Sequence, residues 1–145
     1  MPVRILVADD HPVTRQGVKA ILATRPDLEV CCEASDGAEA LEGVLKYKPD
    51  IVVLDVSMPV MSGFTVAETI ALMNLQVHVL LYTMYYSEHL LREAKRVGVQ
   101  GYVSKTNAAR ELLQAIDRLV EGKTYFGGES SNTAAQNAGR RPLVL

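Results

Sequence analysis

The sequence has no long hydrophobic run, little cysteine and no excess of basic charge, and each absence excludes a class of protein. No stretch approaches the roughly 18 apolar residues that a transmembrane helix needs. The N-terminal segment MPVRILVADD has a short apolar run that ends in acids, which is not the form of a signal peptide. The formal net charge is −2, whereas a domain that binds nucleic acid by itself is usually basic. We therefore expect neither a membrane protein nor direct DNA binding by these residues.

The two cysteines, Cys31 and Cys32, are adjacent in one expected strand. This arrangement favours ordinary thiols over a disulfide or a metal site. Because successive side chains of a strand alternate, we expect the two thiols to point to opposite faces of the sheet. Reduced thiols are typical of a cytoplasmic protein, and we expect that location here.

What is present is a regular alternation of short apolar runs and helical patterns in a chain of 145 residues, the size of one domain. The runs are VRILVA (3–8), LEVCCEA (28–34), DIVVLD (50–55), VHVLLYT (77–83) and GYVSK (101–105). Most are almost continuously apolar, which is typical of parallel strands covered on both faces, whereas the second alternates and suits an edge. The pattern predicts a flavodoxin-like (βα)₅ α/β fold, a three-layer sandwich for which we adopt the strand order 2-1-3-4-5.

The last helical pattern sets the expected end of this domain. Its apolar stripe runs over residues 109–120, and Gly122 is placed to terminate the helix. The segment after it is rich in Gly, Ser, Asn and Ala and has no apolar periodicity. We therefore expect a folded domain over residues 1–122 and a flexible linker or tail over 123–145, with no DNA-binding domain in this chain.

Polar residues end four of the five runs. Asp9 and Asp10 follow the first, Asp55 ends the third, Thr83 the fourth and Lys105 the fifth. Each alone has an ordinary explanation, as a turn acid or helix cap, a β-branched strand residue or a solvated lysine. In an open parallel sheet, however, ligands bind beyond the carboxyl ends of the strands, where the strand order reverses. The convergence of all five residues on this edge therefore indicates a site.

The residue types at this edge point to phosphoryl transfer. Three carboxylates in a partly desolvated site repel one another, and a divalent cation with hard oxygen ligands, such as Mg²⁺, relieves the repulsion. A carboxylate can accept a phosphoryl group as an aspartyl phosphate. Positioned positive charge and donors stabilise the charge on the transferred oxygens. We therefore predict that Asp55 is the phosphoacceptor and that Mg²⁺, Lys105 and the Thr83 hydroxyl contact the phosphoryl oxygens.

The pieces ILVADDHP, IVVLDVSMPVMSG, LLYT and GYVSK, in this order, resemble the receiver domain of bacterial two-component response regulators. The resemblance covers residues 3 to about 122. It implies that Asp55 takes its phosphoryl group from a phosphohistidine on a sensor histidine kinase. It also implies that Mg²⁺ is bound by Asp10, Asp55 and the backbone carbonyl of Ser57, with Asp9 helping through water. Such a domain is a signalling phosphoacceptor and not an enzyme.

The same resemblance gives Thr83 and Lys105 contacts with the phosphoryl group and makes Tyr102 an aromatic switch residue. Phosphorylation of Asp55 would draw the Thr83 hydroxyl inward and vacate space into which the Tyr102 ring rotates, changing the surface around the fourth helix and fifth strand. The alternative is that Tyr102 is an ordinary aromatic residue of a half-buried strand.

Three further features resemble the NarL (LuxR-type) subfamily: the His-Pro pair after the acids, the Thr-Met pair at 83–84 and the ending ARELLQAIDRLVEGKTYF. Members of that subfamily carry a C-terminal helix-turn-helix, regulate transcription and can form homodimers on phosphorylation. We therefore expect the receiver part of a transcriptional regulator, with RRPLVL resembling the start of the missing domain. The alternative is a stand-alone receiver that acts through protein contacts.

Other functions on a related fold fit the sequence less well. The carboxylates of ADDHPVTR would repel the phosphate of a flavin, and an aspartate-nucleophile phosphatase would carry a D-x-D pair after the first strand. A pseudo-receiver typically lacks an acid or the lysine, and none is missing here. No G-x-x-x-x-G-K-[ST] motif for nucleotide binding is present. His11 and Pro12 start the first helix, and we assign them no chemistry.

Overall fold

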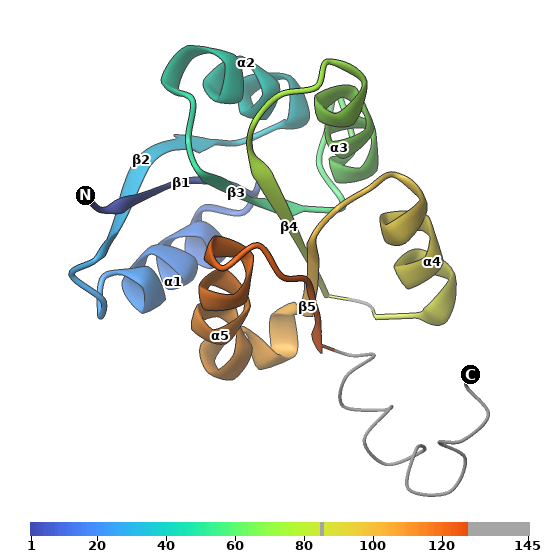
Figure 1. The fold of residues 1–145 in the computed structure, drawn as a ribbon. Coiled ribbons are helices and arrows are strands. Elements are labelled where there is room, and N and C mark those ends of the chain that lie inside the picture. Colours follow the sequence, from blue (N-terminus) through green and yellow to red (C-terminus); the bar gives the residue numbers. More distant parts are fainter. Residues whose placement is uncertain (85, 128–145) are drawn as a thin grey trace, which may run out of the picture.

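The computed structural model describes residues 1–84 and 86–127, in which strands and helices alternate along the chain (Figure 1). The elements are β1 (Val3–Ala8), α1 (Pro12–Leu22), β2 (Leu28–Ala34), α2 (Gly37–Tyr47), β3 (Ile51–Asp55), α3 (Gly63–Leu72), β4 (His78–Thr83), α4 (Glu88–Arg96), β5 (Gly101–Ser104), the 3₁₀ turn η1 (Lys105–Asn107), α5 (Ala108–Val120) and β6 (Tyr125–Phe126). The five expected strands are all present, each within one residue of its apolar run. Within the described residues, no helix is long and apolar enough to cross a membrane.

The strands form one parallel sheet in the order β2-β1-β3-β4-β5-β6. The predicted order of the first five strands is therefore confirmed, with β2 at an edge. Helices α1 and α5 cover one face of the sheet, and α2, α3 and α4 cover the other (Figure 1). This three-layer arrangement is the predicted flavodoxin-like fold, and it brings the carboxyl ends of all strands to one edge.

Each face of the sheet has its own apolar core. Strand β3 is buried along its whole length, as a central parallel strand covered on both faces must be. The face under α1 and α5 buries residues from the sheet and both helices: Ile5, Val7, Val18, Leu22, Ile51, Val53, Leu80, Tyr82, Val103, Leu112, Ala115, Ile116 and Leu119. The opposite core includes Leu6, Val44, Val52, Leu54, Val66, Ile70, Leu81 and Tyr102. The two clusters pack against both faces of the sheet and so hold the polar carboxyl ends of the strands in place at one edge.

Strand β2 contains an irregularity at the cysteine pair. Ile5 pairs with Val30 and Leu6 with Cys32, so Cys31 is an extra residue with no partner in the ladder. Val30 packs against the core under α1 and α5, whereas Cys32 packs against the opposite core, so the alternation of side chains is interrupted. Burial, together with the neighbouring Cys31 thiol, raises the pKa of Cys32 to about 12. The extra residue at Cys31 thus breaks the strict alternation on which the expectation of opposite-facing thiols rested.

The sheet also continues beyond the expected end of the domain. Strand β6 lies in the segment that we predicted to be a tail, and it pairs in parallel with β5, Tyr125 beside Gly101 and Phe126 beside Tyr102. A two-residue strand leaves almost no periodic signal in a sequence, and its position depends on pairing with a distant segment. The ammonium of Lys95 on α4 lies 4.9 Å from the centre of the Phe126 ring. The expected tail from residue 128 onward lies outside the described residues.

Candidate functional site

A cavity of about 350 Å³ opens at the carboxyl edge of the sheet. It is lined by His11, Thr14, Asp55, Ser57, Thr83, Met84 and Lys105. A larger hollow of about 530 Å³ lies at the opposite edge, where its lining includes Val3, Gln76 and Gln100. Only the smaller cavity is lined by residues from the predicted site, so the candidate site is there and not in the larger hollow.

Parallel register brings two of the predicted acids side by side. Ala8 pairs with Leu54, so Asp9 and Asp55, one residue further along β1 and β3, come level with each other. Both side chains are buried, at 0% and 3% exposure. The Lys105 ammonium lies 3.0 Å from Asp9 Oδ2 and 3.1 Å from Asp55 Oδ2. The lysine that follows β5 therefore bridges the acids of β1 and β3, as the predicted site requires.

Asp9 is held by donors on both of its carboxylate oxygens. Oδ2 accepts from the Tyr82 hydroxyl at 2.5 Å and from Lys105, and Oδ1 accepts from the backbone N–H of His11 at 2.8 Å. Burial acts to raise the pKa of Asp9, but these donors outweigh it and hold the pKa below its ordinary value. Asp9 is therefore held in its ionised form by donors on both oxygens.

Asp55 has the opposite balance. Burial raises its pKa above the ordinary value, and the charge of Asp9 adds to the effect, while Lys105 and the Ser57 N–H oppose it. The Ser57 N–H donates to Asp55 Oδ1 over 3.3 Å, a long hydrogen bond. Asp55 thus faces the cavity with fewer strong donors than Asp9, which leaves its oxygens available to react.

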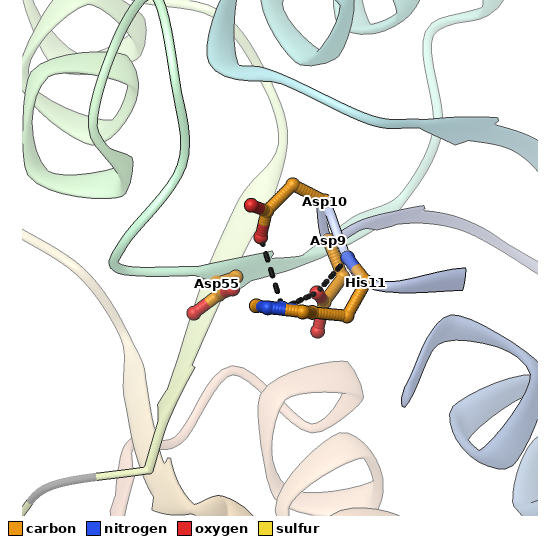
Figure 2. A group of neighbouring side chains, drawn as sticks. All are labelled: Asp9, Asp10, His11 and Asp55. Atoms are coloured by element: carbon orange, nitrogen blue, oxygen red, sulfur yellow. Dashed lines mark hydrogen bonds and ion pairs between the residues drawn. The ribbon is translucent and has the colours of Figure 1, made fainter. Parts of the chain in front are cut away.

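Asp10 and His11 complete a cluster of side chains just beyond the carboxyl end of β1 (Figure 2). One ligand atom from each of Asp9, Asp10, His11 and Asp55 can be chosen so that all lie within 4.8 Å of one another. Asp10 Oδ1 is 3.1 Å from His11 Nδ1, yet it is buried and has no partner in hydrogen-bonding geometry. A buried carboxylate oxygen without a donor, beside two other carboxylates, is a fit for a hard cation such as Mg²⁺.

The loop between β3 and α3 shapes the other wall of the cavity. Gly63 begins α3 and its N–H donates to the Val56 carbonyl at 2.9 Å, so the loop folds back on the end of β3. A Cβ atom at position 63 would collide with the Asp55 carbonyl oxygen, which explains the glycine. Val60, 78% exposed, adopts a φ of 70°, which is strained for a β-branched residue. The loop that carries Ser57 is thus fixed by close backbone contacts.

The two predicted switch residues are both buried. Thr83, at the end of β4, is 5% exposed and lines the cavity. Tyr102 is wholly buried, its hydroxyl has no hydrogen-bond partner among the described residues, and its ring centre lies 5.7 Å from that of Tyr86. Tyr102 is thus deeper than the half-buried position of an ordinary strand aromatic. Burial raises its pKa to about 12.

The structure brings together every side chain that we predicted for the phosphoacceptor site. It also adds two that the sequence reasoning missed, Tyr82 and His11, both of which contact Asp9. Tyr82 lies in an almost continuously apolar run, so its local pattern does not distinguish it from a core residue. A buried tyrosine hydroxyl usually finds a hydrogen-bond partner, however, so a tyrosine in such a run is a candidate for a polar contact. For His11 the sequence predicts only a place at the start of α1.

Comparison with known families agrees with this geometry. A family model described as the response regulator receiver domain matches residues 5–117, most of the chain. The chain therefore belongs to the response regulator receiver domain family, as the resemblance in its motifs implied.

Individual relatives narrow the class further. The chain is 39% identical over 123 residues to the oxygen regulatory protein NreC of Staphylococcus aureus. The aligned region covers 84% of this chain and 57% of NreC. It spans little more than half the length of that relative. The receiver domain of the response regulator NarL from Mycobacterium tuberculosis is 34% identical, with a TM-score of 0.81, and covers 84% of this chain and 98% of that one. A LuxR-family two-component response regulator from Aurantimonas sp. SI85-9A1 is 30% identical, with a TM-score of 0.86, and covers 95% and 99%. The chain is thus a receiver domain of the NarL/LuxR type.

Proposed function

We propose that this receiver domain is a phosphorylation-dependent switch in which Asp55 accepts a phosphoryl group from a phosphohistidine on a sensor histidine kinase. The observation that carries the proposal is the Lys105 ammonium, which lies 3.1 Å from Asp55 Oδ2 at the cavity. A positive charge fixed beside the acceptor is positioned to stabilise the oxygens of an incoming phosphoryl group. The chain then acts as a signalling phosphoacceptor and not as an enzyme.

The transfer is a substitution at phosphorus. An Asp55 carboxylate oxygen forms the new P–O bond as the P–N bond to the donor imidazole breaks, and the imidazole nitrogen keeps the electron pair and later takes a proton. Lys105 neutralises one phosphoryl oxygen, and the Thr83 hydroxyl, buried at the same cavity, donates to another. These residues orient the acceptor and the phosphoryl group.

Mg²⁺ fits the residues present. Asp10, Asp55 and the backbone carbonyl of Ser57 would hold it, with Asp9 contributing through water, and it would neutralise charge on the acids and the phosphoryl group. The support is the buried Asp10 Oδ1, which has no hydrogen-bond partner among the described residues. Among the described residues, Lys105 is the one lysine or arginine that forms an ion pair with these acids, and it reaches Asp9 and Asp55 but not Asp10.

The switch itself involves Thr83 and Tyr102. We propose that the hydroxyl of Thr83 moves toward phosphorylated Asp55 and that this favours the buried placement of Tyr102 against Tyr86 over an exposed one. Helix α4 and strand β5 carry the surface next to these rings. A change in the proportion of buried and exposed Tyr102 therefore alters what that surface presents to a partner.

The wider role is also a proposal. One reported relative is named an oxygen regulatory protein and another a response regulator of the LuxR family, which supports transcription regulation through a separate DNA-binding domain. We propose that a homodimer forms on phosphorylation. A stand-alone receiver that acts through protein contacts is the alternative. A cytoplasmic location accords with either role.

Mass spectrometry tests the phosphoacceptor directly. Incubation with Mg²⁺ and acetyl phosphate is expected to add about 80 Da, the mass of one phosphoryl group, to the parent protein. Asp55→Asn should lose this gain, and Asp27→Asn, a change at a 57% exposed aspartate paired with Arg25, should keep it. No gain in the parent would favour a pseudo-receiver, and a gain in Asp55→Asn equal to that of the parent would reject Asp55 as the acceptor.

A further inference from the structure

Tyr82 is a buried polar residue that the phosphoacceptor chemistry does not use. It is the penultimate residue of β4, wholly buried in the core under α1 and α5. Its Cα partner in β3 is Asp55, so the two side chains lie next to each other on one face of the sheet. The hydroxyl cannot reach water, and it donates instead to Asp9 Oδ2 over 2.5 Å.

This hydrogen bond fixes which way the Asp9 carboxylate faces. Asp9 Oδ2 is shared between Tyr82 and Lys105, and Oδ1 is occupied by the His11 N–H at 2.8 Å. Asp10 offers the contrast, because its buried Oδ1 has no hydrogen-bond partner. Of the two adjacent acids, Asp9 has protein donors on both oxygens, whereas Asp10 has a buried oxygen without a hydrogen bond.

The Tyr82 ring also borders Lys105. The Lys105 ammonium lies 4.8 Å from the centre of the ring, within the range of a cation–π contact. The ring and the Asp9 carboxylate thus form two sides of the place in which the ammonium sits, and Asp55 forms the third. The same side chain therefore touches both the lysine and the acid that holds it.

We propose that Tyr82 is a positioning residue of this site: its hydroxyl keeps Asp9 turned toward Lys105, so that Lys105 stays beside Asp55 and the cation is left to Asp10 and Asp55. The inference rests on the proposed role of Asp55 as phosphoacceptor. Without the hydroxyl, Asp9 has one donor fewer and more unbalanced charge, and it is free to turn toward the cation. Lys105 then loses the fixed acid that aligns it.

The test is Tyr82→Phe, which removes the hydroxyl and keeps the ring. Two quantities are measured: the Mg²⁺ dissociation constant, from amide chemical shifts without a phosphodonor, and the rate of Asp55 phosphorylation by acetyl phosphate at saturating Mg²⁺. We expect Mg²⁺ to bind at least about 2-fold more tightly and phosphorylation to slow about 10-fold, which corresponds to about 1.4 kcal/mol. A general structural defect would weaken both. The matched control is Tyr125→Phe, whose hydroxyl donates to Gln114 away from the site, and both quantities should stay within about 2-fold of the parent.

A mutant cycle identifies the route of the effect. In an Asp9→Asn background, Tyr82→Phe should change Mg²⁺ affinity no further, because the acid on which it acts is gone. In the parent, the Tyr82 hydroxyl proton should appear as a slowly exchanging, downfield resonance that Asp9→Asn removes. This resonance is observed without Tyr82→Phe, so it remains informative even if Tyr82→Phe folds poorly. Equal kinetics in Tyr82→Phe and the parent, or additive effects in the cycle, would overturn the role of Tyr82. Failure of the parent to be phosphorylated would instead overturn the proposed function.

Discussion

Replacing Asp10 with asparagine is expected to stabilise the protein in EDTA and to lose that advantage in saturating Mg²⁺. The substitution keeps the size of the side chain and removes one negative charge from the acid cluster. In EDTA it relieves repulsion, whereas in Mg²⁺ it removes a ligand that lets the cation stabilise the folded state. Opposite effects under the two conditions separate a cation site from an ordinary polar loop.

The separation of the acids sets the size of the effect. One oxygen from each acid lies within 4.8 Å of the others, and at an effective dielectric constant of about 20 two unit charges at that distance repel by about 3.5 kcal/mol. Lys105 contacts Asp9 and Asp55 and offsets their repulsion, but no ion pair joins it to Asp10 among the described residues. The Asp10 side chain is 30% exposed, so water screens part of its interaction. We therefore expect Asp10→Asn to raise the free energy of unfolding in EDTA by about 1–3 kcal/mol.

Urea unfolding followed by circular dichroism measures this difference. The parent should gain stability on addition of Mg²⁺, by about 2.7 kcal/mol when Mg²⁺ is at 100 times its dissociation constant, and Asp10→Asn should gain much less. Glu121→Gln, at a side chain 58% exposed just past the C-terminal end of α5, serves as the control and should change neither value. A lower free energy of unfolding for Asp10→Asn than for the parent in EDTA would refute the reasoning, because the carboxylate would then be held by donors that outweigh its repulsion.

Two other predictions concern Val60 and Asp55. Val60→Gly should raise the free energy of unfolding by about 1 kcal/mol, because a φ of 70° strains a β-branched residue and suits glycine; a loss of stability in urea unfolding would contradict it. The pKa of Asp55 is raised, chiefly by burial, so the folded state binds the proton of the Asp55 carboxyl group more tightly than the unfolded state does. As pH rises through that pKa, which lies above 3.8, the parent should therefore lose stability relative to Asp55→Asn in EDTA. Urea unfolding of both proteins between about pH 4 and 7 measures how much less stable the parent is than Asp55→Asn. If this difference in the free energy of unfolding shrinks as pH rises, the prediction is contradicted.

The sequence is most informative where burial is strongest. The central strands β1, β3 and β4 are covered on both faces, so their apolar runs are nearly continuous and their polar ends stand out. That contrast is enough, from the sequence alone, to predict that Asp9, Asp55 and Thr83 meet at one edge of the sheet. Family membership, confirmed by the comparisons, accounts for the order of the strands.

What the sequence could not supply depends on contacts between distant segments. Strand β6 exists because it pairs with β5, and the extra residue at Cys31 appears only when β2 is aligned with β1. The role of Tyr82 has the same origin. An aromatic residue in an apolar run looks like core, and only the register that sets β4 beside β3 and β1 shows which carboxylate its hydroxyl meets.

Strand β6 has a mechanical consequence. Phe126 is the Cα partner of Tyr102, and its ring contacts the ammonium of Lys95 on α4. Strand β6 therefore lies along the strand that carries the buried tyrosine and also contacts the neighbouring helix. Within the sheet β6 pairs with β5 alone, so a shift of β5 or α4 would change the surroundings of β6 without rearranging β1, β2 or β3.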